Sequence, residues 1–170
     1  MIGKLEQWNA LSTEEAARDI LPCCGSRAWA QAMAARRPIA TPELLVEASR
    51  EVWNGLPEEE WMEAFASHPR IGASGPAAGA TARAREWSAQ EQRQVAEGEA
   101  ALKAALAEGN REYERRFGRI FIVCATGKSP QEILHILQRR LQNNEAAELL
   151  ASAAEQQEIT QIRLRKWLGT

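Results

Sequence analysis

The chain has 170 residues, of which 45% are hydrophobic and 26% charged, and its formal net charge is −2. This composition indicates a globular chain with one domain over residues 1–170, and it excludes an intrinsically disordered chain. No basic block predicts nucleic-acid binding and no polybasic amphipathic segment predicts membrane binding, so we expect neither as a partner.

The predicted location is the cytoplasm. Residues 1–15 lack the apolar core and cleavage site of a signal peptide, and no apolar run approaches the roughly 18 residues that a membrane span requires. Three cysteines, of which Cys23 and Cys24 are adjacent, make a poor disulfide framework and look like part of a packed turn. These features together favour a reduced compartment.

In chain order, helix start and stop signals come first. Ser12 and Glu15 have the spacing of a capping box and predict a helix to about Leu21. Three more helices are expected over residues 26–37, which Pro38 ends, over residues 42–55, which Thr41 caps, and over residues 57–66. The six tryptophans fall mostly on apolar faces, so we expect them in the core or at an interface.

The second half of the chain continues this pattern. We expect a loop over residues 69–86, then helices over residues 88–109 and 110–117, a helix that Ser129 and Pro130 start and that continues to Leu141, and a last helix over residues 145–168. The run RIFIVCATG alone has β-like composition, and a single strand cannot form a sheet. We therefore expect this run to be a buried extended connection or part of a helix. The predicted fold class is therefore all-α: a compact, single-domain multi-helix bundle with one short extended segment. The arginine pairs 36–37, 115–116 and 139–140 are expected at solvated helix ends.

His68 is the first candidate for chemistry. It is one of two histidines, and a single histidine is more often structural than catalytic. It follows a helix that ends in small residues and borders a Gly/Ala-rich stretch, where reactive groups tend to lie. Pro69 biases His68 away from the helical conformation, so the ring can leave the helix end. His135, in the interior of EILHILQRRL, is explained by packing alone.

The stretch SAQEQ, residues 88–92, allows two interpretations. Ser88 and Glu91 have capping-box spacing, and a helix start would account for both residues. The same first turn would also offer free amides and a positive dipole end to an anion or a carbonyl oxygen. From the spacing alone the cap is favoured. No set of metal ligands, phosphate-binding loop or serine-hydrolase elbow is found, so we expect no metal.

Six stretches carry a resemblance when taken in order: CCGSRAW, SHPRIG, SAQEQ, EYERRFGRIFIVCATGKS, RLQN and EITQIRLRKWL. From about Leu11 to Leu168 the chain resembles the 2-oxo-4-hydroxy-4-carboxy-5-ureidoimidazoline (OHCU) decarboxylase family of urate degradation. The resemblance implies an all-helical enzyme, usually a homodimer, that needs no cofactor. It implies decarboxylation of a small ureidoimidazoline carboxylate to (S)-allantoin.

The resemblance also implies roles for individual residues. His68 and Glu91 are the implied catalytic residues. The implied substrate-binding residues are Pro69, Ser88, Ala89, Gln90, Gln92, Phe121, Ile122, Val123, Cys124, Ala125 and Arg163. Arg165 is the weaker candidate for the family's arginine. Some relatives have an acidic residue where this chain has Arg70, so the role of Arg70 stays open.

Two other functions remain as alternatives. A ureide hydrolase acting on 5-hydroxyisourate would lack the second histidine that such chemistry tends to use. A helical protein-interaction module would make SAQEQ only a cap and the Gly/Ala-rich stretch only a linker. The sequence does not tell whether residues 74–84 close over a site as a lid.

Overall fold

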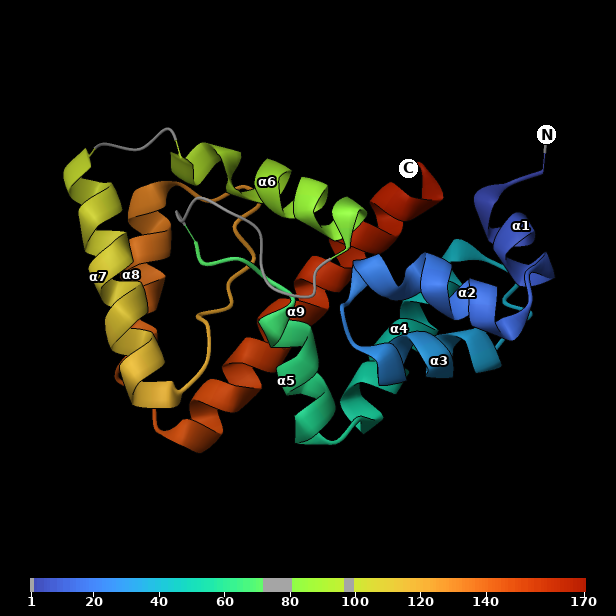
Figure 1. Cartoon of the computed structure of the whole chain (residues 1–170), viewed down its shortest axis with the longest axis horizontal. Coiled ribbons are helices and arrows are strands. Elements are labelled where there is room, and N and C mark those ends of the chain that lie inside the picture. The colour runs from blue at the N-terminus through green and yellow to red at the C-terminus, as the bar shows by residue number, and fades with distance from the viewer. Residues whose placement is uncertain (1, 72–80, 97–99) are drawn as a thin grey trace. The chain divides into compact units, whose positions relative to one another are not determined.

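The structure is a computed structural model that describes residues 2–71, 81–96 and 100–170 (Figure 1). Within these ranges the elements are helices and no strand occurs, so the all-α prediction is confirmed. The residues group into two compact units, unit 1 with residues 1–64 and 157–170 and unit 2 with residues 65–156. The single domain stays a prediction, and each unit is described by itself below.

Unit 1 contains most of the N-terminal helices. Its elements are α1 (Lys4–Ala10), α2 (Thr13–Ile20), the 3-10 helix η1 (Leu21–Cys23), α3 (Arg27–Ala35), α4 (Pro42–Gly55), most of α5 (Glu58–Ala66) and the second half of α9 (Glu145–Leu168). The predicted caps are confirmed, because Ser12 Oγ accepts from the Glu15 amide and Thr41 Oγ1 from the Leu44 amide, both at 3.3 Å. α1 has no sequence prediction, since Gly3 at its start offers no side-chain cap.

Aromatic side chains form much of the core of unit 1. Trp8 is fully buried, and its indole N–H donates to the Ala16 carbonyl at 2.8 Å. Its ring meets that of Trp167 edge to face, with centroids 5.7 Å apart. Trp29 and Trp53 are buried as well. The prediction that tryptophans lie in the core is therefore confirmed for Trp8, Trp29, Trp53 and Trp167, whereas Trp61 is half-buried.

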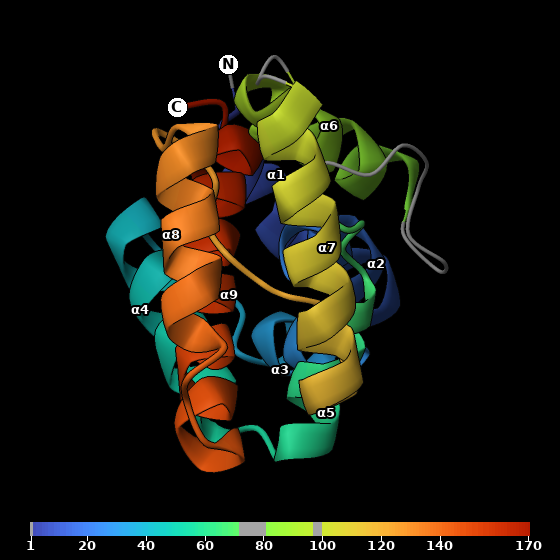
Figure 2. The ribbon, with the colours of Figure 1, turned by 90° about the vertical axis from the view of Figure 1, so that its left-hand side faces the viewer.

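Unit 2 contains α6 (Ala82–Ala96), α7 (Ala100–Phe117), α8 (Pro130–Arg140) and the first half of α9. Figures 1 and 2 show α7 and α8 side by side and running in the same direction. Parallel neighbouring helices need a return connection along their length. The extended segment Phe121–Ala125 supplies it, because five extended residues span about 16 Å, as does an 11-residue helix.

The extended segment is part of the core of unit 2. Successive side chains of an extended chain point to opposite sides. Phe121, Val123 and Ala125 join a cluster of buried side chains that also includes Ile71, Leu106, Tyr113, Phe117, Ile133, Leu137 and Leu141. Ile122 and Cys124, on the other side, are also buried. The prediction of a short buried connection is therefore confirmed.

The predicted helix boundaries are wrong at two places in unit 2. α6 begins at Ala82, well before Ser88, and Thr81 Oγ1 caps it by accepting from the Ala84 amide at 3.1 Å. Gly109 lies inside α7 and does not end a helix. A Cβ at Gly109 would lie 2.6 Å from Leu137 Cδ2, so glycine allows α7 and α8 to pack closely. Most of the proposed lid, residues 74–80, lies outside the described residues.

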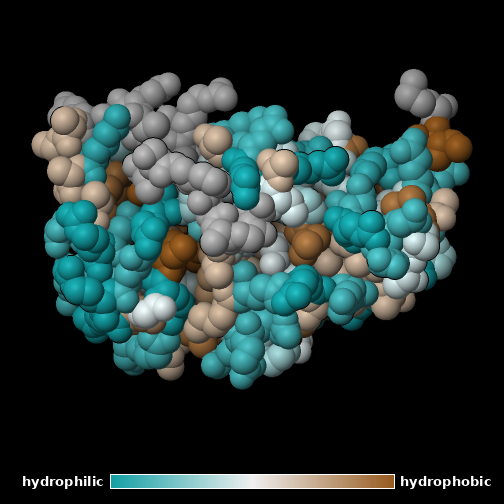
Figure 3. Space-filling view, viewed as in Figure 1, coloured by the Kyte–Doolittle hydropathy of each residue, from teal (hydrophilic) through white to brown (hydrophobic). Residues whose placement is uncertain are grey.

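On the face shown in Figure 3, hydrophilic residues predominate and apolar residues form small, separate patches. No described helix combines the length and apolar character needed to cross a bilayer. The prediction of solvated arginine pairs is wrong for Arg140, which is 7% exposed and ion-paired with the buried Glu148.

Candidate active site

His68 lies just after α5, inside unit 2. Its amide donates to the Phe65 carbonyl at 3.2 Å, and its side chain is buried. The ring Nε2 is hydrogen-bonded to Oε1 of Gln156, on α9, at 2.7 Å. The ring is therefore held between the end of one helix and the side of another.

The chain that follows His68 is attached to α7. Arg70 Nε donates to Glu114 Oε1 at 2.6 Å, and Asn110 Nδ2 donates to the Ile71 carbonyl at 3.0 Å. Arg70, which sequence analysis left open, is thus an anchor for the backbone beside His68. Because its side chain is mostly exposed, this ion pair contributes to local position more than to stability.

The backbone of the extended segment is held by side chains. A buried backbone amide or carbonyl needs a hydrogen-bond partner, and within the described residues no second strand is present to supply one. The Cys124 amide donates to Glu155 Oε2 at 2.8 Å, and its carbonyl accepts from Lys128 Nζ at 2.6 Å. Arg140 Nη1 donates to the Ile122 carbonyl. The path of the segment therefore depends on residues outside it.

Arg140 belongs to a buried polar network. Its Nε donates to Glu148 Oε1 at 2.9 Å, and its Nη2 donates to Ser152 Oγ at 3.0 Å. The Tyr113 hydroxyl donates to the same Glu148 oxygen at 2.5 Å. Burial, with this hydrogen bond, raises the pKa of Tyr113 to about 12, so the phenol remains a donor at neutral pH.

Glu148 is ionised in this network. Burial alone would raise the pKa of its carboxyl group. The hydrogen bonds from Arg140 and Tyr113 outweigh burial and hold that pKa below its ordinary value. Glu148 and Arg140 therefore form a charged pair, and this pair holds in place the guanidinium group that donates to the Ile122 carbonyl.

Glu91 lies near the extended segment. Burial raises the pKa of the Cys124 thiol, Lys128 lowers it, and the carboxylates of Glu155 and Glu91 raise it further, so both carboxylates lie within electrostatic reach of that thiol. Ser88 is buried and lies one helical turn before Glu91, on the same face of α6. Glu91 on α6 and Glu155 on α9 therefore both act electrostatically on Cys124 within unit 2.

The capping-box interpretation of SAQEQ is wrong. Ser88 lies in the interior of α6, so the amides of residues 88–92 are not those of a helix start. The idea that these amides bind an anion falls with it. Ala89 and Gln90 are exposed, and the side chain of Gln92 lies outside the described part of the chain. The substrate-binding roles of Ser88, Ala89, Gln90 and Gln92 and the catalytic role of Glu91 stay predictions.

Arg163 belongs to unit 1, on the second half of α9. It is 1% exposed, and its Nη1 donates to the Pro22 carbonyl at 3.2 Å. Pro22 precedes the buried Cys23 and Cys24, which confirms the predicted packed turn. Burial raises the pKa of Cys24 to about 12, so this thiol is un-ionised at neutral pH. Arg165 is exposed, in keeping with its weaker candidacy.

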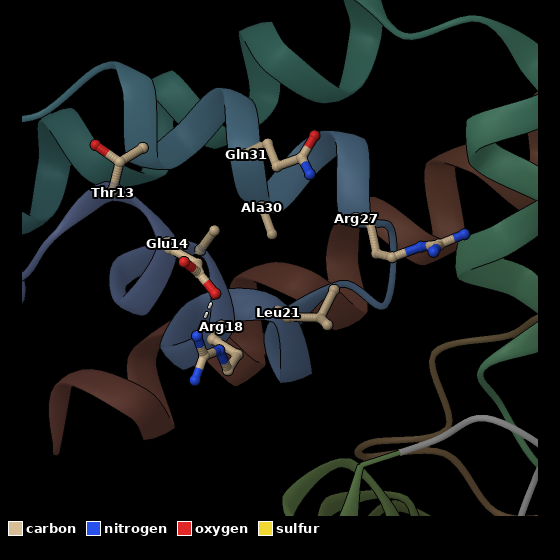
Figure 4. Close-up of a pocket in the computed structure, with 8 residues that line it drawn as sticks. Thr13, Glu14, Arg18, Leu21, Arg27, Ala30 and Gln31 are labelled. Carbon is tan, nitrogen blue, oxygen red and sulfur yellow. Dashed lines mark hydrogen bonds and ion pairs between the residues drawn. The ribbon is translucent and has the colours of Figure 1, made fainter.

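A pocket of about 510 Å³ lies elsewhere in unit 1, against α2 and α3 (Figure 4). Its lining consists of Thr13, Glu14, Ala17, Arg18, Leu21, Arg27, Ala30 and Gln31. Arg18 donates to Glu14 at 2.6 Å and Arg27 to Glu63 at 2.9 Å, so both guanidinium groups have carboxylate partners. None of the sequence-predicted site residues lines it. Among the described residues, no three His, Cys, Asp or Glu side chains are grouped to hold a metal ion.

Two curated proteins are similar to this chain in sequence. A uric acid degradation bifunctional protein (TTL) of Arabidopsis thaliana is 36% identical over 145 residues, which cover 85% of this chain and 44% of that protein. A uric acid degradation bifunctional protein of Bacillus sp. (strain TB-90) is 24% identical over 166 residues, covering 96% of this chain and 32% of that protein. The chain thus spans less than half the length of these relatives.

Solved structures and a family model agree with these relatives. The crystal structure of an OHCU decarboxylase in the presence of (S)-allantoin is 32% identical, has a TM-score of 0.75, and is matched over 89% of this chain and 99% of that one. A structure of (S)-allantoin synthase shares the fold, with 17% identity, a TM-score of 0.73 and coverage of 98% and 54%. The model of a family described as OHCU decarboxylase matches residues 9–165. This chain belongs to the OHCU decarboxylase family.

Proposed function

We propose that the chain catalyses decarboxylation of 2-oxo-4-hydroxy-4-carboxy-5-ureidoimidazoline to (S)-allantoin, without a metal or organic cofactor. The observation that carries the proposal is the buried His68 ring, bound to Gln156 at 2.7 Å in the unit that also contains Glu91 and the extended segment. Membership of the family supports the reaction class, and the 32% identical OHCU decarboxylase solved in the presence of (S)-allantoin supports the product.

The substrate can supply its own electron sink. The carbon that loses carbon dioxide also carries a hydroxyl group and adjoins the ring C=N. The electron pair of the breaking C–C bond forms a new C=C bond, while the C=N electrons move to nitrogen, which takes up a proton. The enol then loses its hydroxyl proton and gains a proton at C5 on one face. Net, one carboxylate and one proton become carbon dioxide and a C–H bond.

The proposed roles follow from side-chain chemistry. His68, whose ordinary pKa lies near neutral pH, removes the hydroxyl proton or delivers the C5 proton, with Glu91 as its partner carboxylate. Arg163 suits bidentate binding of a carboxylate or ureido oxygen. The proposed substrate contacts are made by Pro69, by residues 88–90 and Gln92, and by the segment Phe121–Ala125. Because the Cys124 amide already donates to Glu155, other main-chain groups of the segment bind the ring carbonyls.

The reaction itself is the first test. Urate oxidation products are followed by circular dichroism with and without the purified chain. A decarboxylase makes (S)-allantoin accumulate from the carboxylated intermediate faster than the spontaneous decay, which is not stereoselective. A hydrolase would instead consume 5-hydroxyisourate and leave the allantoin step at its spontaneous rate. A non-catalytic interaction module would change neither step, and either of these outcomes contradicts the proposal.

We also propose that the protein works as a homodimer in the cytoplasm. The family resemblance supports the dimer, and the three buried cysteine thiols support a reducing compartment. Light scattering of the purified chain measures its mass in solution. We expect twice the 18.9 kDa of one chain, and a monomer at micromolar concentration would contradict the dimer.

A further inference from the structure

The first half of α9 carries a stripe of polar side chains. Glu148, Ser152, Glu155 and Gln156 follow one another at spacings of four, three and one, which places them along one side of a helix. Glu148, Ser152 and Gln156 are fully buried. Buried polar groups are costly unless each has a partner, and this stripe binds three other parts of unit 2, namely His68, Cys124 and Arg140.

Two of these contacts hold the extended segment. Glu155 accepts from the Cys124 amide, and Glu148 holds the Arg140 guanidinium that donates to the Ile122 carbonyl. The third contact is that of Gln156 with His68. The same stripe thus holds both the histidine and the segment of the candidate site. No role for Gln156 follows from the sequence motifs.

The chemistry of the third contact fixes the state of the ring. A glutamine Oε1 can only accept a hydrogen bond, so Nε2 of His68 must be the donor. A neutral imidazole with its proton on Nε2 has Nδ1 as its basic nitrogen. The imidazolium also donates from Nε2, so this contact persists when the ring gains or loses a proton. Nδ1 is then the atom at which the proton is exchanged.

We propose that Gln156 is a positioning residue that holds the neutral His68 in its Nε2–H tautomer and assigns proton exchange to Nδ1. The role in catalysis rests on the function proposed above, whereas the tautomer does not. Other ionisable groups that the described contacts bring to this part of unit 2 are Glu155 on α9, Glu91 on α6 and Lys128 after the segment. A hydrogen-bond acceptor that faces one ring nitrogen favours the tautomer with the proton on that nitrogen.

The tautomer is measured directly by long-range ¹H–¹⁵N NMR of the ring nitrogens. The chain has two histidines, so a His135→Asn variant leaves the His68 signals alone in the spectrum. We expect Nε2 to appear protonated and Nδ1 unprotonated at high pH. In Gln156→Met we expect a mixture of tautomers and a kcat about 100-fold lower, with a smaller change in KM, because the ring is no longer held in the reactive geometry.

The Gln156→Glu variant is a second test, because it keeps a hydrogen-bond acceptor beside Nε2 of His68. We expect it to retain the Nε2–H tautomer, to raise the pKa of His68, and to move the pH dependence of kcat/KM upward with it. Gln138→Met, an exposed position on α8, is the matched control and should change none of these quantities.

Two results would overturn the proposal: an Nδ1–H tautomer in the unmodified protein, or a tautomer and pH profile unchanged in both Gln156 variants. If the Gln156→Met variant does not fold, the proposal is still tested by the tautomer of the unmodified protein and by the Gln156→Glu variant. If the protein forms no allantoin, the proposed function fails, and the NMR result still decides the tautomer.

Discussion

The His68→Asn variant is expected to lose (S)-allantoin formation while the protein remains folded. Asparagine is smaller and does not titrate, so proton transfer at the ring position ends. A positioned acid–base group contributes about 10²–10⁴-fold to a rate, which would bring this reaction close to its spontaneous decay. The measurement is the circular dichroism assay with freshly generated substrate, together with a thermal unfolding curve of each variant.

His135→Asn is the matched control for this substitution. His135 is the other histidine and is exposed on α8, so its replacement should leave both the rate and the unfolding curve unchanged. A His68→Asn variant that still forms allantoin faster than spontaneous decay, with the same stereochemistry, would show that His68 is not the acid–base group.

Glu148→Gln is expected to give the largest loss of stability. It removes the charge that neutralises the buried Arg140, and breaking one side of a buried ion pair costs about 3–5 kcal/mol of unfolding free energy. Denaturant titration of each variant at pH 7 measures it. Tyr113→Phe, which removes one hydrogen bond to the same carboxylate, should cost less, about 1.5–3 kcal/mol.

The same carboxylate gives a definite pH dependence. Its pKa in the folded chain lies below the ordinary 4.5, so its contribution to stability is complete above that value and is lost as the pH falls through the folded-state pKa. The stability gap between the unmodified protein and Glu148→Gln should therefore shrink as the pH falls below about 4.5. A gap that is constant from pH 7 to pH 3 would contradict this assignment.

Glu108→Gln supplies the control for Glu148. Glu108, on α7 of the same unit, pairs with Arg111 and Arg115 on the exposed surface. The substitution is chemically identical, but water screens this pair. We expect little change in unfolding free energy, so a loss as large as that in Glu148→Gln would mean that burial is not the cause of the effect.

Local signals in the sequence predicted much of the fold. Capping residues such as Ser12 and Thr41 specify helix starts through contacts within one turn, and these predictions are confirmed. Ser129 caps α8 in the same way. The start of α6 was harder to predict, because Thr81 precedes a run without apolar periodicity whereas Ser88 and Glu91 imitate a cap. Gly109 imitates a helix end, and only its packing against Leu137 explains it.

The site was predictable only in part. Residue types and a family resemblance pointed to His68 and Glu91. Gln156, Glu155 and Arg140 carried no local pattern, since each acts on a residue at least 18 positions away in the sequence. Contacts at such separations depend on how α8 and α9 fold back onto the extended segment. A sequence pattern that spans one helical turn therefore cannot predict these contacts.

In the extended segment between α7 and α8, the residues that hold the backbone differ from the residues whose side chains the segment presents. Its path is fixed by Arg140, Glu155 and Lys128, which bind main-chain groups that every amino acid except proline possesses. The side chains at positions 122 and 124 take no part in these hydrogen bonds. Substitutions there can alter the chemistry presented by the segment while the backbone remains where it is. Such an arrangement lets a scaffold acquire a new substrate preference by changes at one or two positions.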